Sequence, residues 1–240
     1  MIKKIKIGTR ASRLAIAQTF HVVQLLNKYL QSQYFCPLEY EIIKIKTTGD
    51  IINDRPLSSI GGKGLFLKEI QEHLLDNKID MAVHSLKDMP AIMPKNLTLA
   101  AILPRDDARD VLVCSQDKKG DLRDLLRDNA TISTCSHRRK TFLANINKNL
   151  VIDDIRGNID SRIAKVDSKK VDGIVIAAAG LKRLKMENRI SCYFTLDQMI
   201  PAVGQGAICV ECHQDNIDII NLVSKIECWQ TRRCTSLERL

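Results

Sequence analysis

Short apolar runs alternate with longer amphipathic stretches along most of this sequence. Apolar runs bounded by glycine, proline or polar residues are typical of buried strands, and apolar residues at helical spacing predict helices. We expect strands at 4–7, 40–45, 78–83, 97–103, 111–114, 131–134, 151–155, 173–180 and 208–211. We expect helices at 13–29, 65–75, 121–126 and 215–225, with a last one beginning near Trp229. Strands that alternate with helices predict an α/β fold with parallel sheets.

Two proline-containing segments interrupt this alternation, at 104–107 and 201–206, and we interpret them as crossings between domains. At 240 residues the chain is long enough for two domains with separate cores. We therefore expect two α/β domains hinged around a cleft. The predicted division is 1–103 for the first segment of domain 1, 104–200 for domain 2, 201–226 for the return segment of domain 1, and 227–240 for the start of a linker helix toward a third domain.

The chain carries a formal net charge of +9, which would attract polyphosphates of any sequence. The basic residues are nevertheless spread along the chain, aromatic residues are few and no nucleic-acid-binding motif is present, so we expect no nucleic-acid partner. No apolar run is long enough to cross a bilayer, and the first residues lack the apolar core of a signal peptide. We expect a cytoplasmic monomer with no membrane partner.

The eight cysteines show no regular spacing, and in a cytosolic chain they should be thiols. The sequence CVECH at 209–213 matches the attachment pattern of c-type haem, and with Cys228 and Cys234 it could form a zinc site. We favour a strand in which Cys209 packs as a small apolar residue, because the pattern is short and haem attachment requires export. We therefore expect no metal.

The most distinctive stretch is VHSLKDMP at 83–90. A buried strand ends near His84, and Pro90 prevents a helix from continuing. The turn therefore lies at the carboxyl end of a strand, where open α/β sheets bind their ligands. A carboxylate there can stay ionised beside Lys87, because an adjacent cation favours its charged form. Asp88 is thus the best candidate for catalysis, although exposed Lys–Asp pairs are usually inert.

Basic and hydroxyl residues recur at other strand-to-helix turns. Arg10 and Ser12 follow the first strand, where free backbone N–H groups and the positive end of a helix dipole suit an anion. The sequence SHRR at 136–139 opens a helix with two arginines that could clamp carboxylates. Arg156 is followed about one helical turn later by Arg162, near enough to share a ligand. Plain capping would explain the first serine, and a solvated helix start would explain the arginine pair.

The sequence GGKG at 61–64 precedes the helix expected at 65–75. It is similar to a phosphate cradle but lacks the spacing and the Lys-Ser/Thr ending of a P-loop. We expect a loop that carries one substrate-directed lysine, Lys63.

In this order along the chain, the motifs resemble those of the porphobilinogen deaminase (hydroxymethylbilane synthase) family. The resemblance extends from about residue 5 to Leu240. The motifs that carry it are GTRAS at 8–12, GGKGLF at 61–66, VHSLKDMP at 83–90, SHRR at 136–139, RGN at 156–158, AGLKRL at 179–184 and PAVGQGA at 201–207.

The resemblance implies two domains similar to periplasmic solute-binding proteins of type II, followed by a smaller α+β domain. It also implies a transferase of haem and tetrapyrrole biosynthesis, which condenses four porphobilinogen units head to tail into hydroxymethylbilane and releases ammonia. Asp88 would donate a proton and then stabilise the cationic intermediate. The acetate and propionate arms of the growing chain would be bound by Arg10, Ser12, Lys63, Ser85, Lys87, Ser136, Arg138, Arg139, Arg156, Arg162 and Gln205.

Members of this family carry a dipyrromethane primer on a cysteine of the third domain, soon after the motif that resembles LERL at 237–240. The sequence stops at that motif, and none of its eight cysteines occurs in the family's context. We therefore expect a form without the third domain and the primer attachment. Such a form would bind pyrrole carboxylates but would be impaired in processive elongation.

Three other functions remain open at this point. A noncatalytic hinged protein would bind a small dicarboxylate and turn nothing over. A Schiff-base enzyme would use Lys87 and would be inactivated by borohydride in the presence of a carbonyl substrate. A nucleic-acid binder would show retention on DNA that falls steeply with salt.

Overall fold

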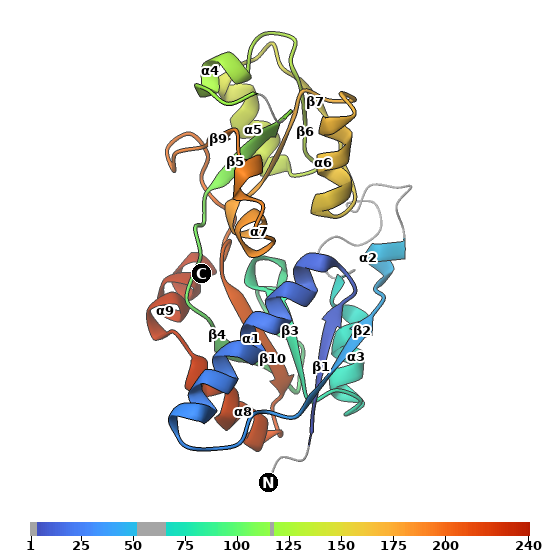
Figure 1. Ribbon diagram of the computed structural model, residues 1–240, viewed down its shortest axis with the longest axis vertical. Helices are drawn as coiled ribbons and strands as arrows, with labels where there is room; N and C mark the ends of the chain where they lie inside the picture. Colours follow the sequence, from blue (N-terminus) through green and yellow to red (C-terminus); the bar gives the residue numbers. More distant parts are fainter. Residues whose placement is uncertain (1–3, 52–65, 116–117) are drawn as a thin grey trace. The chain divides into compact units, whose positions relative to one another are not determined.

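The computed structural model describes residues 4–51, 66–115 and 118–240 (Figure 1). The chain divides into two compact units, and each is described by itself. Unit 1 comprises Met1–Arg105 and Ala207–Leu240, and unit 2 comprises Asp106–Gly206. The chain thus leaves unit 1 after Arg105 and returns to it at Ala207.

Unit 1 is built on a sheet of five described strands in the order β2-β1-β3-β10-β4. β1 runs parallel to β2 and β3, whereas β10 runs antiparallel to β3 and β4. The strands are β1 (Ile5–Arg10), β2 (Tyr40–Ile45), β3 (Met81–Ser85), β4 (Leu97–Ile102) and β10 (Ile208–His213). The helices are α1 (Arg13–Ser32), α2 (Thr48–Ile51), α3 (Lys68–Leu75), η3 (Leu86–Asp88), α8 (Ile217–Val223), η5 (Ser224–Ile226) and α9 (Trp229–Glu238).

Helices cover both faces of the unit 1 sheet (Figure 1). α1 and α8 pack on one face through a buried cluster that includes Leu26, Val83 and Ile219. α3 packs on the other face through Ile70 and Leu74. α1 places a buried residue every three or four positions, which is why its sequence predicts an amphipathic helix. Among the described residues no helix combines the length and the apolar character needed to cross a membrane.

The last helix, α9, packs against the edge strand β4. The backbone N–H of Cys228 donates to the carbonyl of Ile102 at 2.8 Å, and Arg232 Nη2 donates to the carbonyl of Leu99 at 2.9 Å. These donors occupy carbonyl groups that an edge strand would otherwise leave unpaired. The sequence assigned 227–240 to a segment outside domain 1, whereas the structure groups α9 with unit 1.

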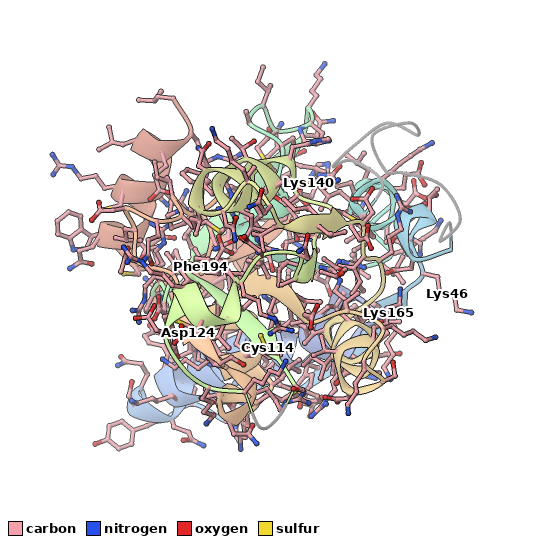
Figure 2. All side chains as sticks on the ribbon, turned by 90° about the horizontal axis from the view of Figure 1, so that it is seen from above. Lys46, Cys114, Asp124, Lys140, Lys165 and Phe194 are labelled. Carbon is pink, nitrogen blue, oxygen red and sulfur yellow. The ribbon has the colours of Figure 1, made fainter. Side chains whose placement is uncertain are left out.

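Unit 2 has the same kind of architecture, a sheet of five described strands in the order β7-β6-β8-β5-β9. α4 and α5 pack on one face around Phe194 and Cys114, both buried and labelled in Figure 2. α6 and α7 pack on the other face through Ile163 and Leu181. The elements are β5 (Asp110–Cys114), α4 (Leu122–Leu125), β6 (Thr131–Ser133), α5 (His137–Ile146), β7 (Val151–Asp153), α6 (Ile159–Asp167), β8 (Gly173–Ala177), α7 (Ala178–Arg183), η4 (Glu187–Arg189) and β9 (Cys192–Tyr193).

The two sheets are mixed, so the prediction of wholly parallel sheets was wrong in this respect. In the described part of unit 1, only β10 runs antiparallel to its neighbours, β3 and β4. In the described part of unit 2, only β5 runs antiparallel to its neighbours, β8 and β9. Each of these strands is the first one after the chain has crossed between units. A crossing chain therefore enters the new sheet from the edge at which the parallel strands end.

Candidate functional site

The first group of predicted site residues lies at one edge of the unit 1 sheet. β1 and β3 are parallel neighbours, with Gly8 opposite Ala82, so both strands end at the same edge. Arg10 is the last residue of β1, and Ser85 is the last residue of β3. The structure thus brings together two segments that are far apart in sequence, at the carboxyl edge where α/β sheets bind ligands.

Asp88 ends the short helical turn η3 directly after β3. The turn is fixed, because Leu86 N–H donates to the carbonyl of Ala207 at 3.0 Å and Met89 N–H donates to the carbonyl of Leu86 at 3.1 Å. Leu86 and Met89 are both buried, whereas Asp88 is half-buried. Within the described residues, no hydrogen bond or ion pair engages its carboxylate. A rigid turn therefore presents an acidic group that can accept a ligand.

Arg10 is held in place by its surroundings. Its guanidinium forms an ion pair with Asp50 and lies over the ring of Phe66, with 4.1 Å between the guanidinium carbon and the ring centroid. Burial opposes ionisation of Asp50, but hydrogen bonds from Arg10 and Thr47 and the charge of Arg10 outweigh it and lower the pKa of that carboxyl. Because a quarter of the Arg10 side chain remains exposed (25%), the group is oriented and still accessible.

The other predicted residues of unit 1 support this edge or lie outside the described residues. Ser12 caps α1 by accepting a hydrogen bond from Ala15 N–H at 3.3 Å. Gln18 Nε2 donates to Ser85 Oγ at 2.8 Å and so joins α1 to the end of β3. Lys87 is half-buried in the same turn as Asp88. Lys63 and the GGKG sequence lie outside the described residues.

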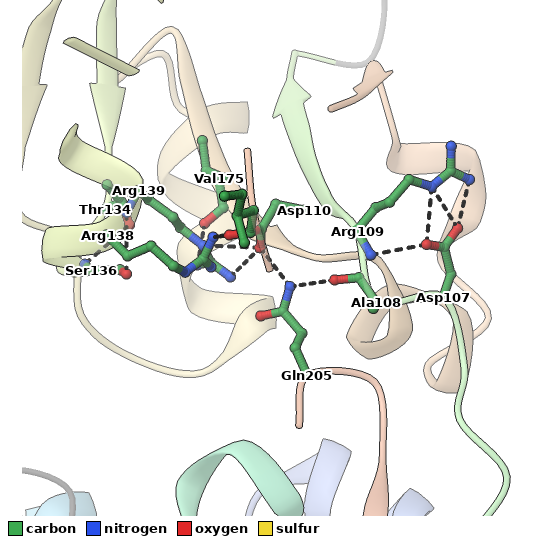
Figure 3. A network of polar contacts seen from close by, with 11 residues as sticks. Asp107, Ala108, Arg109, Asp110, Thr134, Ser136, Arg138, Arg139, Val175 and Gln205 are labelled. Carbon is green, nitrogen blue, oxygen red and sulfur yellow. Dashed lines mark hydrogen bonds and ion pairs between the residues drawn. The ribbon is translucent and has the colours of Figure 1, made fainter. Parts of the chain in front are cut away.

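The second group lies at the equivalent edge of the unit 2 sheet, around the buried carboxylate of Asp110 (Figure 3). β6, β7 and β8 are parallel, and β5 is antiparallel to β8 with Asp110 opposite Ala177. The first residue of β5 therefore lies where the parallel strands end. The segment after β6 carries the predicted SHRR motif at 136–139, and Ser136 caps α5 by accepting a hydrogen bond from Arg139 N–H at 3.5 Å.

Asp110 binds three of the predicted site residues at once. Arg139 donates to Asp110 Oδ1 through Nε at 3.1 Å and Nη2 at 2.7 Å, and its Nη1 donates to the carbonyl of Val175 at 2.8 Å. Arg138 Nη1 lies 2.7 Å from Asp110 Oδ2. Gln205 Nε2 donates to Asp110 Oδ1 at 3.0 Å and to the carbonyl of Ala108 at 2.7 Å.

The members of this network differ in accessibility. Gln205 is completely buried, and the side chain of Arg139 is only 8% exposed, whereas that of Arg138 is 23% exposed. Burial raises the cost of a charge on Asp110, but the charges of Arg139 and Arg138 outweigh it and keep the pKa of this carboxyl below its usual value. The network is therefore an ionised cluster in which Arg138 is the accessible cation.

Arg156 and Arg162 lie around the turn that follows β7. Arg162 Nε donates to the carbonyl of Gly157 at 2.7 Å, which ties the first turn of α6 to the RGN sequence. Gly157 has a φ of +105°, and a Cβ built there would lie 2.2 Å from Ser161 Oγ, so glycine is required. Arg156 is half-buried beside this turn. The two arginines thus flank one tight backbone turn, and their sharing of a ligand stays a prediction.

Sequence reasoning missed two acidic residues of these sites, Asp50 and Asp110. Asp50 belongs to the polar segment after β2, and Asp110 begins an apolar strand, which is an unusual place for an unpaired charge. An acidic residue at the start of a buried apolar strand could have indicated that Asp110 has a cationic partner. The partners of both residues come from distant parts of the chain, so their roles could not be read from local sequence.

The cysteine pattern at 209–213 is part of strand β10. Cys209 and Cys212 are both completely buried, and they belong to different core clusters. Within the described residues no group of three or more His, Cys, Asp or Glu side chains is arranged to hold a metal ion.

The fold is similar to that of several solved structures. The BvgS periplasmic VFT2 domain of Bordetella pertussis matches with a TM-score of 0.53 at 15% sequence identity, covering 97% of this chain and 92% of that one. The substrate binding domain of a putative molybdenum ABC transporter from Clostridium difficile also matches at 0.53, with 12% identity and coverage of 96% and 94%. These similarities define the class of fold, a two-unit α/β protein of the solute-binding type.

Sequence comparison identifies the family. The family model described as "Porphobilinogen deaminase, dipyromethane cofactor binding domain" matches residues 5–221. Porphobilinogen deaminase of Rickettsia bellii (strain OSU 85-389) is 45% identical over 227 residues, which cover 94% of this chain and 73% of that protein. Porphobilinogen deaminase of Ehrlichia canis (strain Jake) is 46% identical over 235 residues, with coverage of 98% and 76%. The chain belongs to the porphobilinogen deaminase family, and the resemblance drawn from its motifs is confirmed.

Proposed function

We propose that the protein is a transferase of tetrapyrrole biosynthesis that joins four porphobilinogen units head to tail into hydroxymethylbilane, with release of ammonia. Membership of the family supports the reaction class. The observation that carries the proposal is the Asp88 carboxylate, half-buried on a fixed turn at the carboxyl edge of the unit 1 sheet. Preorganised acidic groups of this kind can act where charge develops in a transition state.

Asp88 would act on the pyrrole ring of the substrate. Proton donation to the aminomethyl group lets ammonia leave as the carbon–nitrogen bond breaks, and this produces a cationic azafulvene. The resulting carboxylate accepts a hydrogen bond from the pyrrole N–H and stabilises the cation. The α-carbon of the next pyrrole then attacks the exocyclic methylene of the azafulvene to form the new carbon–carbon bond, and the proton that this carbon loses restores the Asp88 carboxyl group. A single carboxyl group therefore serves as acid and as electrostatic stabiliser.

The carboxylate arms of the substrate require cations, and the accessible arginines suit them. The side chain of Arg10 is 25% exposed and that of Arg138 is 23% exposed. Guanidinium groups bind carboxylates through two parallel hydrogen bonds. We assign direct binding to these two, to Arg156 and Arg162, and to Lys63 and Lys87. Ser12, Ser85 and Ser136 would shape the turns around them. Arg139 and Gln205 are buried against Asp110, so in this proposal they position Arg138.

The family's dipyrromethane cofactor bears carboxylates of the same kind, and the donor set of the described residues fits them. An accessible guanidinium such as that of Arg10 or that of Arg138 would hold an acetate or propionate group. When bound, the cofactor supplies the pyrrole to which the first substrate unit is added.

Ammonia release from porphobilinogen tests this function. The protein is expected to release ammonia, and Asp88→Asn should lower kcat at least about 100-fold, which is the usual contribution of a general acid. Asp76→Asn is the matched control, because Asp76 is an exposed acidic residue of unit 1 paired with Lys78. An Asp88→Asn protein as active as the control would contradict the assigned role.

A second candidate is a noncatalytic binding protein for small dicarboxylates, which the solute-binding type of fold favours. The same assay separates the two functions. A binder would change its intrinsic fluorescence or thermal stability with porphobilinogen, and ammonia would not accumulate.

A further inference from the structure

Unit 1 contains a chain of three polar side chains at the strand that leads into the Asp88 turn, of which His84 and Glu211 are buried and Gln71 is half-buried. His84 Nε2 lies 3.2 Å from Glu211 Oε2, and Gln71 Nε2 donates to Glu211 Oε1 at 2.8 Å. Glu211 is completely buried and His84 is 6% exposed. A buried carboxylate is costly unless polar groups lie next to its oxygens, and here His84 and Gln71 each place a nitrogen next to one oxygen of Glu211.

The three side chains come from the three elements that shape the site. His84 is on β3, one residue before Ser85 and four before Asp88. Glu211 is on β10, which follows the return crossing at Ala207. Gln71 is on α3, which follows the GGKG sequence. The polar chain therefore joins β3, β10 and α3.

The strand register makes this contact specific. β3 and β10 pair with Ala82 opposite Glu211 and His84 opposite Cys209, so His84 and Glu211 are diagonal neighbours on the same face. On the other side of β10, the pairing with β4 shifts register between Val210 and Glu211, an irregularity that re-aims a side chain. A slip of one residue between β3 and β10 would move Glu211 to the opposite face of the sheet.

The Asp88 turn depends on this register, because it is hydrogen-bonded to β10. Leu86 N–H donates to the carbonyl of Ala207, directly before β10, and Cys209 Sγ lies 3.7 Å from the carbonyl of His84. We infer that the His84–Glu211–Gln71 chain is a positioning device, which fixes β3 against β10 and α3 and thereby holds the Asp88 turn in its productive geometry. The inference rests on the proposed catalytic role of Asp88.

Hydrogen exchange provides a test that does not depend on activity. In His84→Leu, we expect the Leu86 and Met89 amides to exchange at least about tenfold faster than in the wild type, because the turn opens locally. His84→Gln keeps a donor for Glu211 and should restore most of the protection. Leu26→Ala is the control, because Leu26 is buried on the opposite face of the same sheet. This substitution should destabilise unit 1 as a whole without selectively accelerating amide exchange at the Asp88 turn.

Steady-state kinetics of ammonia release then connects the turn with catalysis. His84→Leu should lower kcat about tenfold with little change in KM, since a misplaced catalytic group affects the chemical step. His84→Gln should recover activity. Leu26→Ala should have the wild-type kcat when it is assayed well below its unfolding temperature. If His84→Leu does not fold, Glu211→Gln serves instead, with the same expected pattern and nearly the same side-chain volume.

The results separate the two claims. Unchanged exchange at Leu86 and Met89 in His84→Leu or Glu211→Gln, or equal exchange in Leu26→Ala, would overturn the positioning role. A wild-type protein that releases no ammonia would contradict the proposed function and leave the exchange result to decide the structural claim. Faster exchange with an unchanged kcat would show that the device does not serve Asp88 and would also overturn the inference.

Discussion

The guanidinium of Arg239 donates a hydrogen bond to the carbonyl oxygen of Pro90, two residues after Asp88. Its Nη1 also lies 3.5 Å from the carbonyl of Met89. The end of α9 therefore holds the outgoing side of the Asp88 turn, while Ala207 holds its incoming side through Leu86. The turn is supported by contacts from residues far along the chain on both sides.

If Asp88 has the proposed role, we expect Arg239→Ala to lower kcat for ammonia release by about tenfold, because a turn that loses its support spends less time in the productive geometry. Arg239→Lys should recover part of the loss, since an ammonium can reach one of the two carbonyls. Arg233→Ala is the matched control, because Arg233 is exposed on the same helix. Equal rates for the Arg239→Ala and Arg233→Ala proteins would argue against a supporting role of α9.

Asp110→Ala should destabilise unit 2 by about 3–5 kcal/mol, because it leaves the buried Arg139 without its counter-charge. Urea unfolding followed by circular dichroism would measure the change. Asp107→Asn offers a comparison, because Asp107 pairs with the more exposed Arg109 and such pairs contribute about 1 kcal/mol or less. A loss for Asp110→Ala as small as that for Asp107→Asn would mean that the buried network contributes little.

We also expect the Asp110 carboxylate to make the stability of unit 2 depend on pH. The folded pKa of Asp110 is lowered, since Arg139 and Arg138 more than offset the effect of burial, so its ionisation stabilises the fold above its unfolded pKa of about 4. That contribution is lost as the pH falls through the lower, folded pKa. The stability difference between wild type and Asp110→Asn should therefore be constant from about pH 5 upward and shrink below about pH 4. A difference that does not change with pH would contradict this assignment.

Gly206→Ala should destabilise unit 2 by about 1–3 kcal/mol, the typical cost of a strained backbone position. Gly206 has a φ of +90°, and a Cβ built there would lie 2.5 Å from the carbonyl oxygen of Asp106. Gly120→Ala is the control, because a Cβ at Gly120 meets nothing within 4 Å. Thermal unfolding of both variants would measure the contrast, and equal melting temperatures would refute the close approach.

Alkylation should distinguish the cysteines by burial. Cys36 and Cys234 are exposed and should react first with iodoacetamide. Cys209 and Cys212 are buried, and burial together with the nearby Glu211 carboxylate raises the pKa of both thiols, so few thiolates form. Mass spectrometry after timed labelling would show both as protected until urea unfolds the chain. Early modification of Cys209 would contradict its place in the core.

The elements were predictable where local sequence determines them. The strand at 40–45 has the predicted bounds, and Ser12 caps α1 because a serine before an amphipathic stretch favours that geometry. Strand direction was not predictable. The apolar pattern of β10 is the same whether the strand runs parallel or antiparallel to β3, and its direction depends on the route by which the chain returns to the sheet.

The candidate site was predictable as a set of motifs, and the details within each motif were not. Arg138 and Arg139 are adjacent in sequence, yet one is accessible and the other is buried. The difference comes from Asp110, which precedes them by 28 and 29 residues. The local sequence predicts a pair of carboxylate-binding arginines, whereas in the folded protein Arg139 is the counter-ion of Asp110.

The position of β10 between β3 and β4 in the unit 1 sheet has a consequence for biosynthesis. β4 pairs only with β10 among the described strands, and β10 lies more than a hundred residues further along the chain. When the ribosome has completed residues 1–105, β3 and β4 therefore still lack the strand that joins them, and both expose unpaired backbone groups. Unit 2 is continuous in sequence and can fold while it emerges, so we expect it to mature first and the Asp88 turn to form last.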